Sequence, residues 1–231
     1  MWITAIVLAG GSGKRMNSDT PKQYLMLEEK PLLYYSLKAF QNSVVDEIIL
    51  VTKAGEEEYC RKEFVEQYGF TKVSAVVTGG KERYHSVFAG LQAIQSCDYV
   101  MIHDGARPLL SIQMIAEVAE AVKKYQACVV GMPVKDTIQI TDETGVIVIT
   151  PKRSNVWQAH TTQAFAFAMV LDAYEKIVQE SDIEVTDDAM VVGRYYDVPV
   201  HMVAGSYMNI KVTTPEDIQV AEIFLREVAQ N

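Results

Sequence analysis

Short apolar runs recur along the chain, and stretches with helical periodicity separate them. Most of these runs are apolar on both faces, as in strands of a parallel sheet that helices cover on both sides. The pattern predicts strands at 4–9, 47–52, 73–77, 99–103 and 127–132. The first run has no basic residues before it and ends at glycines, which indicates a strand and not a signal peptide.

Two amphipathic stretches carry helix-start signals. Ser111 can cap one helix, and Thr214 can cap another in which Pro215 takes the first helical position. The side chains expected to be buried are, in the first helix, Ile112, Ile115, Ala116, Ala119 and Val122, and in the second, Ile218, Ala221, Leu225 and Val228. The alternation of strands and helices predicts an α/β fold, one Rossmann-like domain over 1–231 with a doubly wound, mostly parallel sheet.

One segment, at about 136–153, breaks this alternation. Two β-like runs, 138–140 and 146–149, flank the turn sequence Asp-Glu-Thr-Gly, which is typical of a β-hairpin. A two-stranded ribbon is only marginally stable alone, so this arm must pack against something. Two possibilities stay open: the arm folds back onto its own domain, or it reaches a second subunit, which implies a homodimer.

Composition and charge exclude several classes of protein. The chain has 231 residues and a formal net charge of −9, whereas a general nucleic-acid-binding protein carries a basic face. No apolar run approaches the roughly 18 residues that a membrane span needs. The three cysteines are widely spaced, which fits neither a disulfide framework nor a zinc knuckle. We therefore expect a cytoplasmic protein with free thiols that binds neither nucleic acid nor membrane.

The first predicted strand runs into a glycine-rich turn at 9–13. Glycines let the backbone approach a ligand and direct N–H groups at anionic oxygens. The turn is not a P-loop, because Arg15 follows Lys14 where Ser or Thr is needed, and it is not a dinucleotide fingerprint, because Met16 replaces the third glycine. A tight turn without a ligand is the alternative interpretation.

Three cations follow this turn: Lys14, Arg15 and Lys22. In a chain of negative net charge, this concentration predicts an anion site, and a solvated basic loop is the alternative. A triphosphate needs such a combination, because backbone amides bind the non-reacting oxygens and Arg or Lys stabilises the charge that grows in the transition state.

Several motifs, taken in order, carry a family resemblance. The chain reads Leu-Ala-Gly-Gly-x-Gly-x-Arg-Met at 8–16 and Pro-Lys-Gln-Tyr-Leu at 21–25. Later motifs are Gly-Gly-Lys-Glu-Arg at 79–83, His-Asp-Gly-Ala-Arg-Pro at 103–108, Pro-Val-Lys-Asp-Thr-Ile at 133–138, Val-Thr-Asp-Asp at 185–188 and Asn-Ile-Lys-Val-Thr-Thr-Pro-Glu-Asp at 209–217. Over nearly the whole chain, this order resembles the 2-C-methyl-D-erythritol 4-phosphate cytidylyltransferases.

The resemblance implies a nucleotidyltransferase of the non-mevalonate isoprenoid pathway. Such an enzyme transfers CMP from CTP to 2-C-methyl-D-erythritol 4-phosphate and releases pyrophosphate. The resemblance also implies a Mg²⁺ held mainly by the CTP phosphates, and a homodimer in which each arm embraces the partner subunit. Because the attacking phosphate oxygen is already ionised at neutral pH, no general base is required, and catalysis rests on aligning two anions and neutralising their charge.

The resemblance further implies roles for individual residues. Arg15 and Lys22 are expected to stabilise the transition state, and Arg153 and Lys211 to position the polyol phosphate. The residues expected to bind the nucleotide are Ala9, Gly10, Gly11, Gly13, Gly80, Lys81 and Ser86. Those expected to contact the substrate are Asp104, Arg107, Thr137, Thr161 and Thr186. Because Thr137 and Arg153 belong to the arm, they are expected to act in the partner's site.

Structural roles compete with several of these assignments. Asp104 could cap the loop after its strand, Ser86 could cap a helix, and Lys211 could be a solvated residue at a sheet edge. Asp187 and Asp188 fit the first turn of a short helix, so neither is assigned as a metal ligand.

Departures from the family pattern leave an alternative substrate open. Lys81 stands where the family commonly has an acid, and Thr162 replaces a proline, which predicts a looser loop. The Gly-Gly pair at 10–11 is also typical of the related ribitol 5-phosphate cytidylyltransferases of wall polymer synthesis. The motifs at 103–108 and 209–217 favour the methylerythritol enzymes. A regulatory nucleotide-binding domain without turnover is more remote, because the cations of the site are retained.

Overall fold

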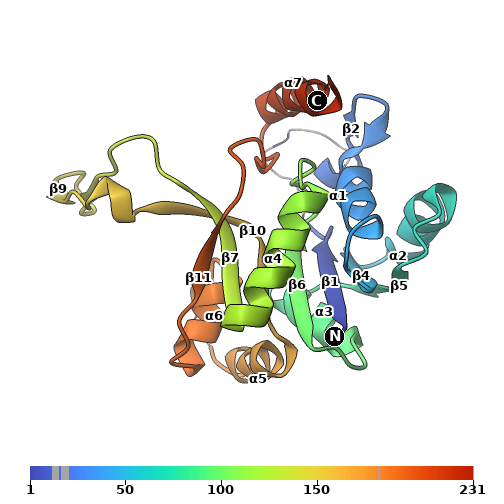
Figure 1. The fold of residues 1–231 in the computed structure, drawn as a ribbon, viewed down its shortest axis with the longest axis horizontal. Helices are drawn as coiled ribbons and strands as arrows, with labels where there is room; N and C mark the ends of the chain where they lie inside the picture. The colour runs from blue at the N-terminus through green and yellow to red at the C-terminus, as the bar shows by residue number, and fades with distance from the viewer. Residues whose placement is uncertain (12–15, 17–20, 182, 231) are drawn as a thin grey trace.

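A computed structural model describes residues 1–11, 16, 21–181 and 183–230. Its centre is a seven-stranded sheet of order β11-β7-β10-β6-β1-β4-β5 (Figure 1). The strands are β1 (Ile3–Leu8), β4 (Glu47–Thr52), β5 (Val73–Thr78), β6 (Tyr99–Asp104), β7 (Ala127–Pro133), β10 (Trp157–Ala166) and β11 (His201–Ala204). The strands predicted from the sequence are β1, β4, β5, β6 and β7, each correct to within one residue at either end.

The sheet is mostly parallel, as predicted. Strand β1 pairs in parallel with β4 and β6, β4 with β5, and β7 with β11, whereas β10 runs antiparallel to β6 and β7. The register places Leu8 beside Val51 on one side and beside Asp104 on the other. The carboxyl ends of β1, β4 and β6 therefore meet at one edge of the sheet, the usual place for a ligand in such folds.

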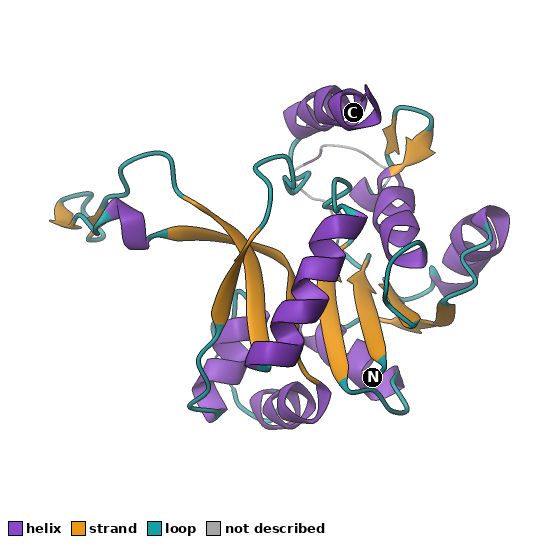
Figure 2. Cartoon of the chain, viewed as in Figure 1, coloured by secondary structure: helices purple, strands orange, loops and turns teal. Residues whose placement is uncertain are grey.

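Helices cover both faces of the sheet (Figure 2). Along β1, Ala5 and Val7 pack in one apolar cluster with α1 and α4, and Ile6 packs in another with α3, α5 and α6. This alternation confirms the doubly wound arrangement.

The larger helices are α1 (Leu32–Gln41), α3 (Arg83–Ala93), α4 (Ile112–Tyr125), α5 (Phe167–Ile177), α6 (Asp188–Tyr195) and α7 (Pro215–Gln230). The shorter elements are η2 (Lys22–Tyr24), β2 (Met26–Leu27), β3 (Lys30–Pro31), α2 (Glu57–Cys60), η3 (Arg61–Glu66) and η4 (Arg153–Asn155).

The two helices expected from start signals are present, but one residue predicted to be buried in each of them is exposed. Ser111 caps α4, because its hydroxyl accepts a hydrogen bond from the Met114 amide at 3.0 Å. Ile112, expected to be buried, is 46% exposed, since it lies in the first turn, and Met114 takes its place in the core. In α7, Val228 is 55% exposed rather than buried, because only the earlier turns of this helix pack on the cluster that contains Ala221.

Between β7 and β10 the chain leaves the sheet as a long arm (Figure 1). The arm carries β8 (Ile140–Thr141) and β9 (Ile147–Ile149), which form a two-stranded sheet of their own. Gly145 has a positive φ of 86°, and the Asp142 amide donates to the Val146 carbonyl, which closes the turn. The predicted hairpin is confirmed, although its strands are shorter than expected.

The arm does not fold back onto its own chain. Its apolar side chains are exposed along both strands; they are Ile140, Val146, Ile147, Val148 and Ile149. The first of the two packing possibilities is therefore wrong for the isolated chain.

Candidate active site

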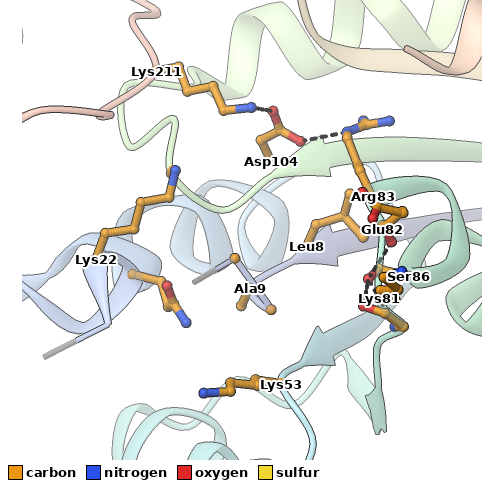
Figure 3. A pocket seen from close by; sticks show the side chains of 15 residues that line it. Leu8, Ala9, Lys22, Lys53, Lys81, Glu82, Arg83, Ser86, Asp104 and Lys211 are labelled. Carbon is orange, nitrogen blue, oxygen red and sulfur yellow. Dashed lines mark hydrogen bonds and ion pairs between the residues drawn. The ribbon is translucent and has the colours of Figure 1, made fainter. Parts of the chain in front are cut away.

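The carboxyl ends of β1, β4 and β6 border a cavity of about 460 Å³ (Figure 3). This volume is typical of a small-ligand site. Its described lining residues are Leu8, Ala9, Gly10, Gly11, Lys22, Gln23, Lys53, Gly80, Lys81, Glu82, Arg83, Ser86, Asp104, Ala106 and Lys211. Five of these are cations and two are acids, in a chain whose net charge is −9. This local excess of positive charge favours a polyanionic ligand.

The glycine-rich turn follows β1 and passes close to the end of β4. The Ala9 amide donates to the Val51 carbonyl at 2.7 Å. At Gly10, a Cβ atom would lie 3.2 Å from the Thr52 carbonyl oxygen, which is tighter than ordinary packing. Gly10 therefore lets the turn form the wall of the cavity next to Lys53.

Gly80 and Ser86 lie together, as the sequence suggested. The Ser86 hydroxyl accepts from the Gly80 amide at 3.1 Å and donates to the Glu82 carbonyl at 3.3 Å. A Cβ atom at Gly80 would lie 2.3 Å from the Cβ of His85, so this position requires glycine. The alternative that Ser86 caps a helix is wrong: the N-cap of α3 is Glu82, which forms a capping box with His85.

Lysines from separate parts of the chain surround the cavity. Figure 3 shows Lys22, Lys53 and Lys211 on different walls. Lys22, in η2, donates from Nζ to the Val212 carbonyl at 3.4 Å, which brings it to the segment that carries Lys211. The Lys211 ammonium lies 2.6 Å from Oδ2 of Asp104, so Lys211 is not merely a solvated edge residue.

Asp104 joins the cavity to a buried ionic network. Its Oδ1 accepts from Arg83 Nε at 3.2 Å, and the Arg83 guanidinium also forms a bidentate pair with Asp188 at 2.7 and 2.8 Å. Asp188 is fully buried and accepts from the Tyr174 hydroxyl. Burial opposes ionisation of Asp104, but the charges of Arg83 and Lys211 outweigh it and hold the pKa of this carboxyl well below its usual value. Asp104 thus orients Lys211 as a carboxylate, and the loop-cap alternative for its side chain is wrong.

Arg107 and Thr161 lie behind the cavity instead of lining it. Arg107 is buried and donates to the Asn209 carbonyl at 2.7 Å. The Asn209 amide nitrogen donates to the Thr161 carbonyl at 3.0 Å, and the Thr161 hydroxyl accepts from the Asp104 amide at 3.0 Å. These contacts fix the segment that precedes Lys211.

The loop expected to be loose at Thr162 is instead part of β10. Thr162 is fully buried, and its hydroxyl lies 3.2 Å from Nδ1 of His103. The strand holds this threonine in place without the proline of the family pattern.

Other assigned residues lie away from the cavity or outside the described residues. Thr137 and Arg153 are exposed on the arm, where Arg153 donates to the Lys135 carbonyl at 3.3 Å. Thr186 is exposed just before α6, whose N-cap is Asp187. Gly13 and Arg15, with Lys14, belong to the part of the chain that the structure does not describe.

Sequence reasoning assigned no role to several residues of the cavity wall, among them Gln23, Lys53 and Arg83. Gln23 and Arg83 lie within quoted motifs, so their positions were signalled although their roles were not. Lys53 is a lone lysine after a strand, a pattern without specificity, and only the packing of β4 against β1 reveals it.

The described residues contain no group of three or more His, Cys, Asp or Glu side chains that could hold a metal ion. At the cavity, both oxygens of Asp104 are already paired with cations. This donor set fits a Mg²⁺ held mainly by the phosphate oxygens of a nucleotide, because this small, hard cation retains water and phosphate ligands readily.

Comparison with known proteins agrees with this geometry. Residues 3–227 match the family described as "IspD: 2-C-methyl-D-erythritol 4-phosphate cytidylyltransferase". The chain is similar to proteins of that name from Lachnoclostridium phytofermentans, 48% identical over 97% of both chains, and Lachnospira eligens, 49% identical over 96% of this chain and 99% of the other. It also resembles the crystal structure of 4-diphosphocytidyl-2C-methyl-D-erythritol synthase from Anaerococcus prevotii, with a TM-score of 0.86 and 33% identity over 97% of this chain and 96% of the other. The chain therefore belongs to the 2-C-methyl-D-erythritol 4-phosphate cytidylyltransferase family of nucleotidyltransferases.

Proposed function

We propose that this chain transfers CMP from CTP to 2-C-methyl-D-erythritol 4-phosphate, forming 4-diphosphocytidyl-2-C-methyl-D-erythritol and pyrophosphate for isoprenoid precursor synthesis. The observation that carries the proposal is the meeting of Lys22 and Lys211 at a cavity whose other wall contains Gly80 and Ser86. The cations suit a triphosphate, and the backbone–hydroxyl pair suits the edge of a base. Family membership supports the choice of both substrates.

The chemistry requires charge neutralisation more than proton transfer. A phosphate oxygen of the polyol attacks the α-phosphorus of CTP, a new P–O bond forms, and the bond to the β-phosphate breaks with its electron pair leaving on pyrophosphate. At about 4 Å, two unit charges repel by about 4 kcal/mol at an effective dielectric of 20, so cations at this point lower the barrier. Lys22 and Arg15 stabilise the crowded α-phosphorus, and Lys211, oriented by Asp104, holds the incoming phosphate.

The remaining contacts divide between nucleotide and polyol. The turn at Ala9, Gly10, Gly11 and Gly13 offers amides to the phosphates, and Gly80 with Ser86 reads the cytosine. Bound Mg²⁺ supplies further charge neutralisation on the triphosphate. Lys81 adds an ammonium group beside Gly80. Arg107 and Thr161 are proposed to serve the polyol site from behind, by holding the Lys211 segment. Thr186 is proposed as a polyol contact on the strength of its motif.

The arm is proposed to complete the site of a second subunit. Its exposed apolar strands need a cover, because a contiguous apolar surface of this kind usually marks an interface. Thr137 and Arg153 stand on the arm, away from the cavity of their own chain. A homodimer in which the arm crosses to the partner would bring both residues to the partner's polyol phosphate.

We place the protein in the cytoplasm. None of the helices in the described residues combines the length and apolarity needed to cross a bilayer. All three cysteines are free thiols, and Cys60 and Cys128 are buried, which suits a reducing compartment.

The decisive experiment is incubation of the protein with CTP, Mg²⁺ and either 2-C-methyl-D-erythritol 4-phosphate or ribitol 5-phosphate. Pyrophosphate release gives the rate, and mass spectrometry identifies the CDP-alcohol. We expect kcat/KM to favour the methylerythritol substrate by at least about tenfold, equivalent to about 1.4 kcal/mol. The reverse preference would move the protein to the ribitol reaction, and CTP binding without pyrophosphate release would indicate a regulator.

A further inference from the structure

Gln23 presents an unexplained polar group in the wall of the cavity. This side chain is only 2% exposed, and among the described residues neither its Oε1 nor its Nε2 has a hydrogen-bond partner. Burying a carboxamide without hydrogen-bond partners is energetically unfavourable. When a folded protein contains such a group, it usually binds a water or a ligand there, or the group has a functional role.

A second glutamine shows how this fold treats a structural carboxamide. Gln163 is also 2% exposed, but its Oε1 accepts from the amides of Asp188 and Ala189 at 3.1 and 3.0 Å. Its Nε2 donates to Asp187 at 3.3 Å. Burial of a glutamine in this chain therefore does not by itself leave the carboxamide unpaired, and Gln23 differs because it lines the cavity.

The position of Gln23 indicates which part of a ligand it meets. It directly follows Lys22 in η2, and the Lys22 Cε lies 3.7 Å from where a Cβ of Gly11 would stand. Gln23 therefore belongs to the part of the wall that contains Gly11 and Lys22, and Figure 3 shows Lys22 on the side of the cavity opposite Ser86. A primary amide donates well to phosphate oxygens, which are strong acceptors.

We propose that Gln23 is a nucleotide-binding residue whose Nε2 donates a hydrogen bond to a non-bridging phosphate oxygen of the nucleoside triphosphate. This inference rests on the proposed function, since it assumes that CTP occupies the cavity. In the described part of the chain the amide has no partner, so a hydrogen bond that forms only when the nucleotide binds adds to the affinity for CTP. Because this contact holds the substrate before and during reaction alike, it lowers KM for CTP more than it changes kcat.

The test compares Gln23→Met with Gln163→Met. Methionine has a similar length and no hydrogen-bonding amide, so each variant removes one buried carboxamide. Thermal unfolding without ligand should show Gln23→Met as stable as the wild type or more stable, because this carboxamide has no hydrogen bond to the described residues. Gln163→Met should unfold at a clearly lower temperature, because it leaves the buried amides of Asp188 and Ala189 without their acceptor.

Calorimetric titration then measures binding of CTP and of cytidine. For Gln23→Met we expect CTP affinity to fall about tenfold or more, as for a lost hydrogen bond to a charged group, with cytidine affinity unchanged. KM for CTP should rise while kcat stays within about threefold. Gln23→Asn, which keeps the amide but shortens its reach, should also weaken CTP binding, and this variant decides the matter if the methionine variant does not fold.

Two results would overturn the inference. The first is unchanged CTP affinity in a folded Gln23 variant, which would make Gln23 a structural residue. The second is an equal loss for CTP and cytidine, which would place the contact on the base or sugar. Failure of the wild-type protein itself to bind CTP would instead contradict the proposed function, so the two failures are distinguishable.

Discussion

At the residue scale, contacts with neighbouring groups hold two lysine ammonium groups at defined points of the cavity. Lys211 is oriented by Asp104, whose ionised form is secured by Arg83. Lys22 approaches from η2 and touches the backbone of the Lys211 segment through Val212. Two lysines from distant parts of the chain are thus brought to one cavity, as in-line attack between two phosphates requires.

Replacing Lys22 by methionine removes the ammonium and keeps most of the aliphatic stem. If Lys22 stabilises charge that grows in the transition state, kcat should fall by about 100- to 1,000-fold, while CTP affinity changes much less. Steady-state pyrophosphate release and calorimetric CTP binding measure the two effects. Lys62→Met, at an exposed surface position on η3, is the matched control and should leave kcat unchanged. An unaltered kcat in the Lys22 variant would remove the assigned role.

Most of the residues that sequence reasoning identified belong to motifs in which residue type and spacing together imply contact with a phosphate or base. Gly80 with Ser86, and Lys22 with Lys211, are brought to one cavity as such motifs suggest. Arg83 belongs to a motif as well, but its two acidic partners, Asp104 and Asp188, lie in later segments of the chain. These segments approach Arg83 only in the folded protein. Lys53 carries no motif at all. Contacts that arise from tertiary packing alone leave no local trace in the sequence.

His103 should make stability depend on pH. It is fully buried next to Thr162, and burial lowers its pKa from 6.5 to about 4. The unfolded chain therefore binds a proton between these values that the folded chain does not, so the free energy of unfolding falls as the pH drops through this range. His160 has its pKa lowered to about 4 by burial as well and acts in the same direction.

Urea unfolding at pH 7 and pH 5 tests this effect. Between these values, the wild type should lose about 2 kcal/mol more unfolding free energy than His103→Gln, which cannot titrate. The comparison uses the change with pH, so a constant loss of stability in the variant does not disturb it. Parallel pH dependence of the two proteins would show that His103 is not protonated on unfolding.

At the scale of elements, the strands that were predicted are those with continuous apolar runs. Strand β10 escaped prediction because its sequence, Trp157–Ala166, mixes polar and apolar residues. Only its second half is buried between β6 and β7, and its threonines and Gln163 are satisfied there by side-chain hydrogen bonds. The hairpin of the arm was predicted because its turn sequence is a local signal. The direction in which the arm leaves the sheet was not predicted, because this direction depends on the surface against which the arm packs.

The pair between Arg83 and Asp188 fastens α3 to α6 behind the cavity. Asp188→Asn removes the bidentate counter-ion of the guanidinium and leaves it the single contact with Asp104, and breaking a buried pair typically costs about 3–5 kcal/mol. Urea unfolding should show this loss of stability. Asp172→Asn, which removes an exposed ion pair with Lys176 on α5, should change stability little. Equal effects of both substitutions would show that the buried pair has no special role.

At the scale of the whole molecule, the exposed arm is the feature on which the proposed dimer depends. An apolar two-stranded ribbon that stands away from its own domain requires a partner surface, and a closed two-fold dimer covers both arms at once. The cavity carries the residues that we propose bind the nucleotide, whereas Arg153 and Thr137 lie on the arm. If the two groups meet only across the interface, each active site is built from two chains.

Mixing two inactive variants distinguishes a shared site from a self-contained one. Lys22→Met damages the cavity of its own chain, and Arg153→Met damages the contribution of the arm. In a heterodimer with crossed arms, one site receives both defects and the other receives neither, so random exchange should restore about a quarter of wild-type activity. If Arg153 served its own cavity, both sites of the heterodimer would keep one defect and no activity would return. The measurement is pyrophosphate release before and after subunit exchange, with light scattering to establish the dimer. Each variant exchanged with itself is the control, because restored activity then comes only from the mixed pair.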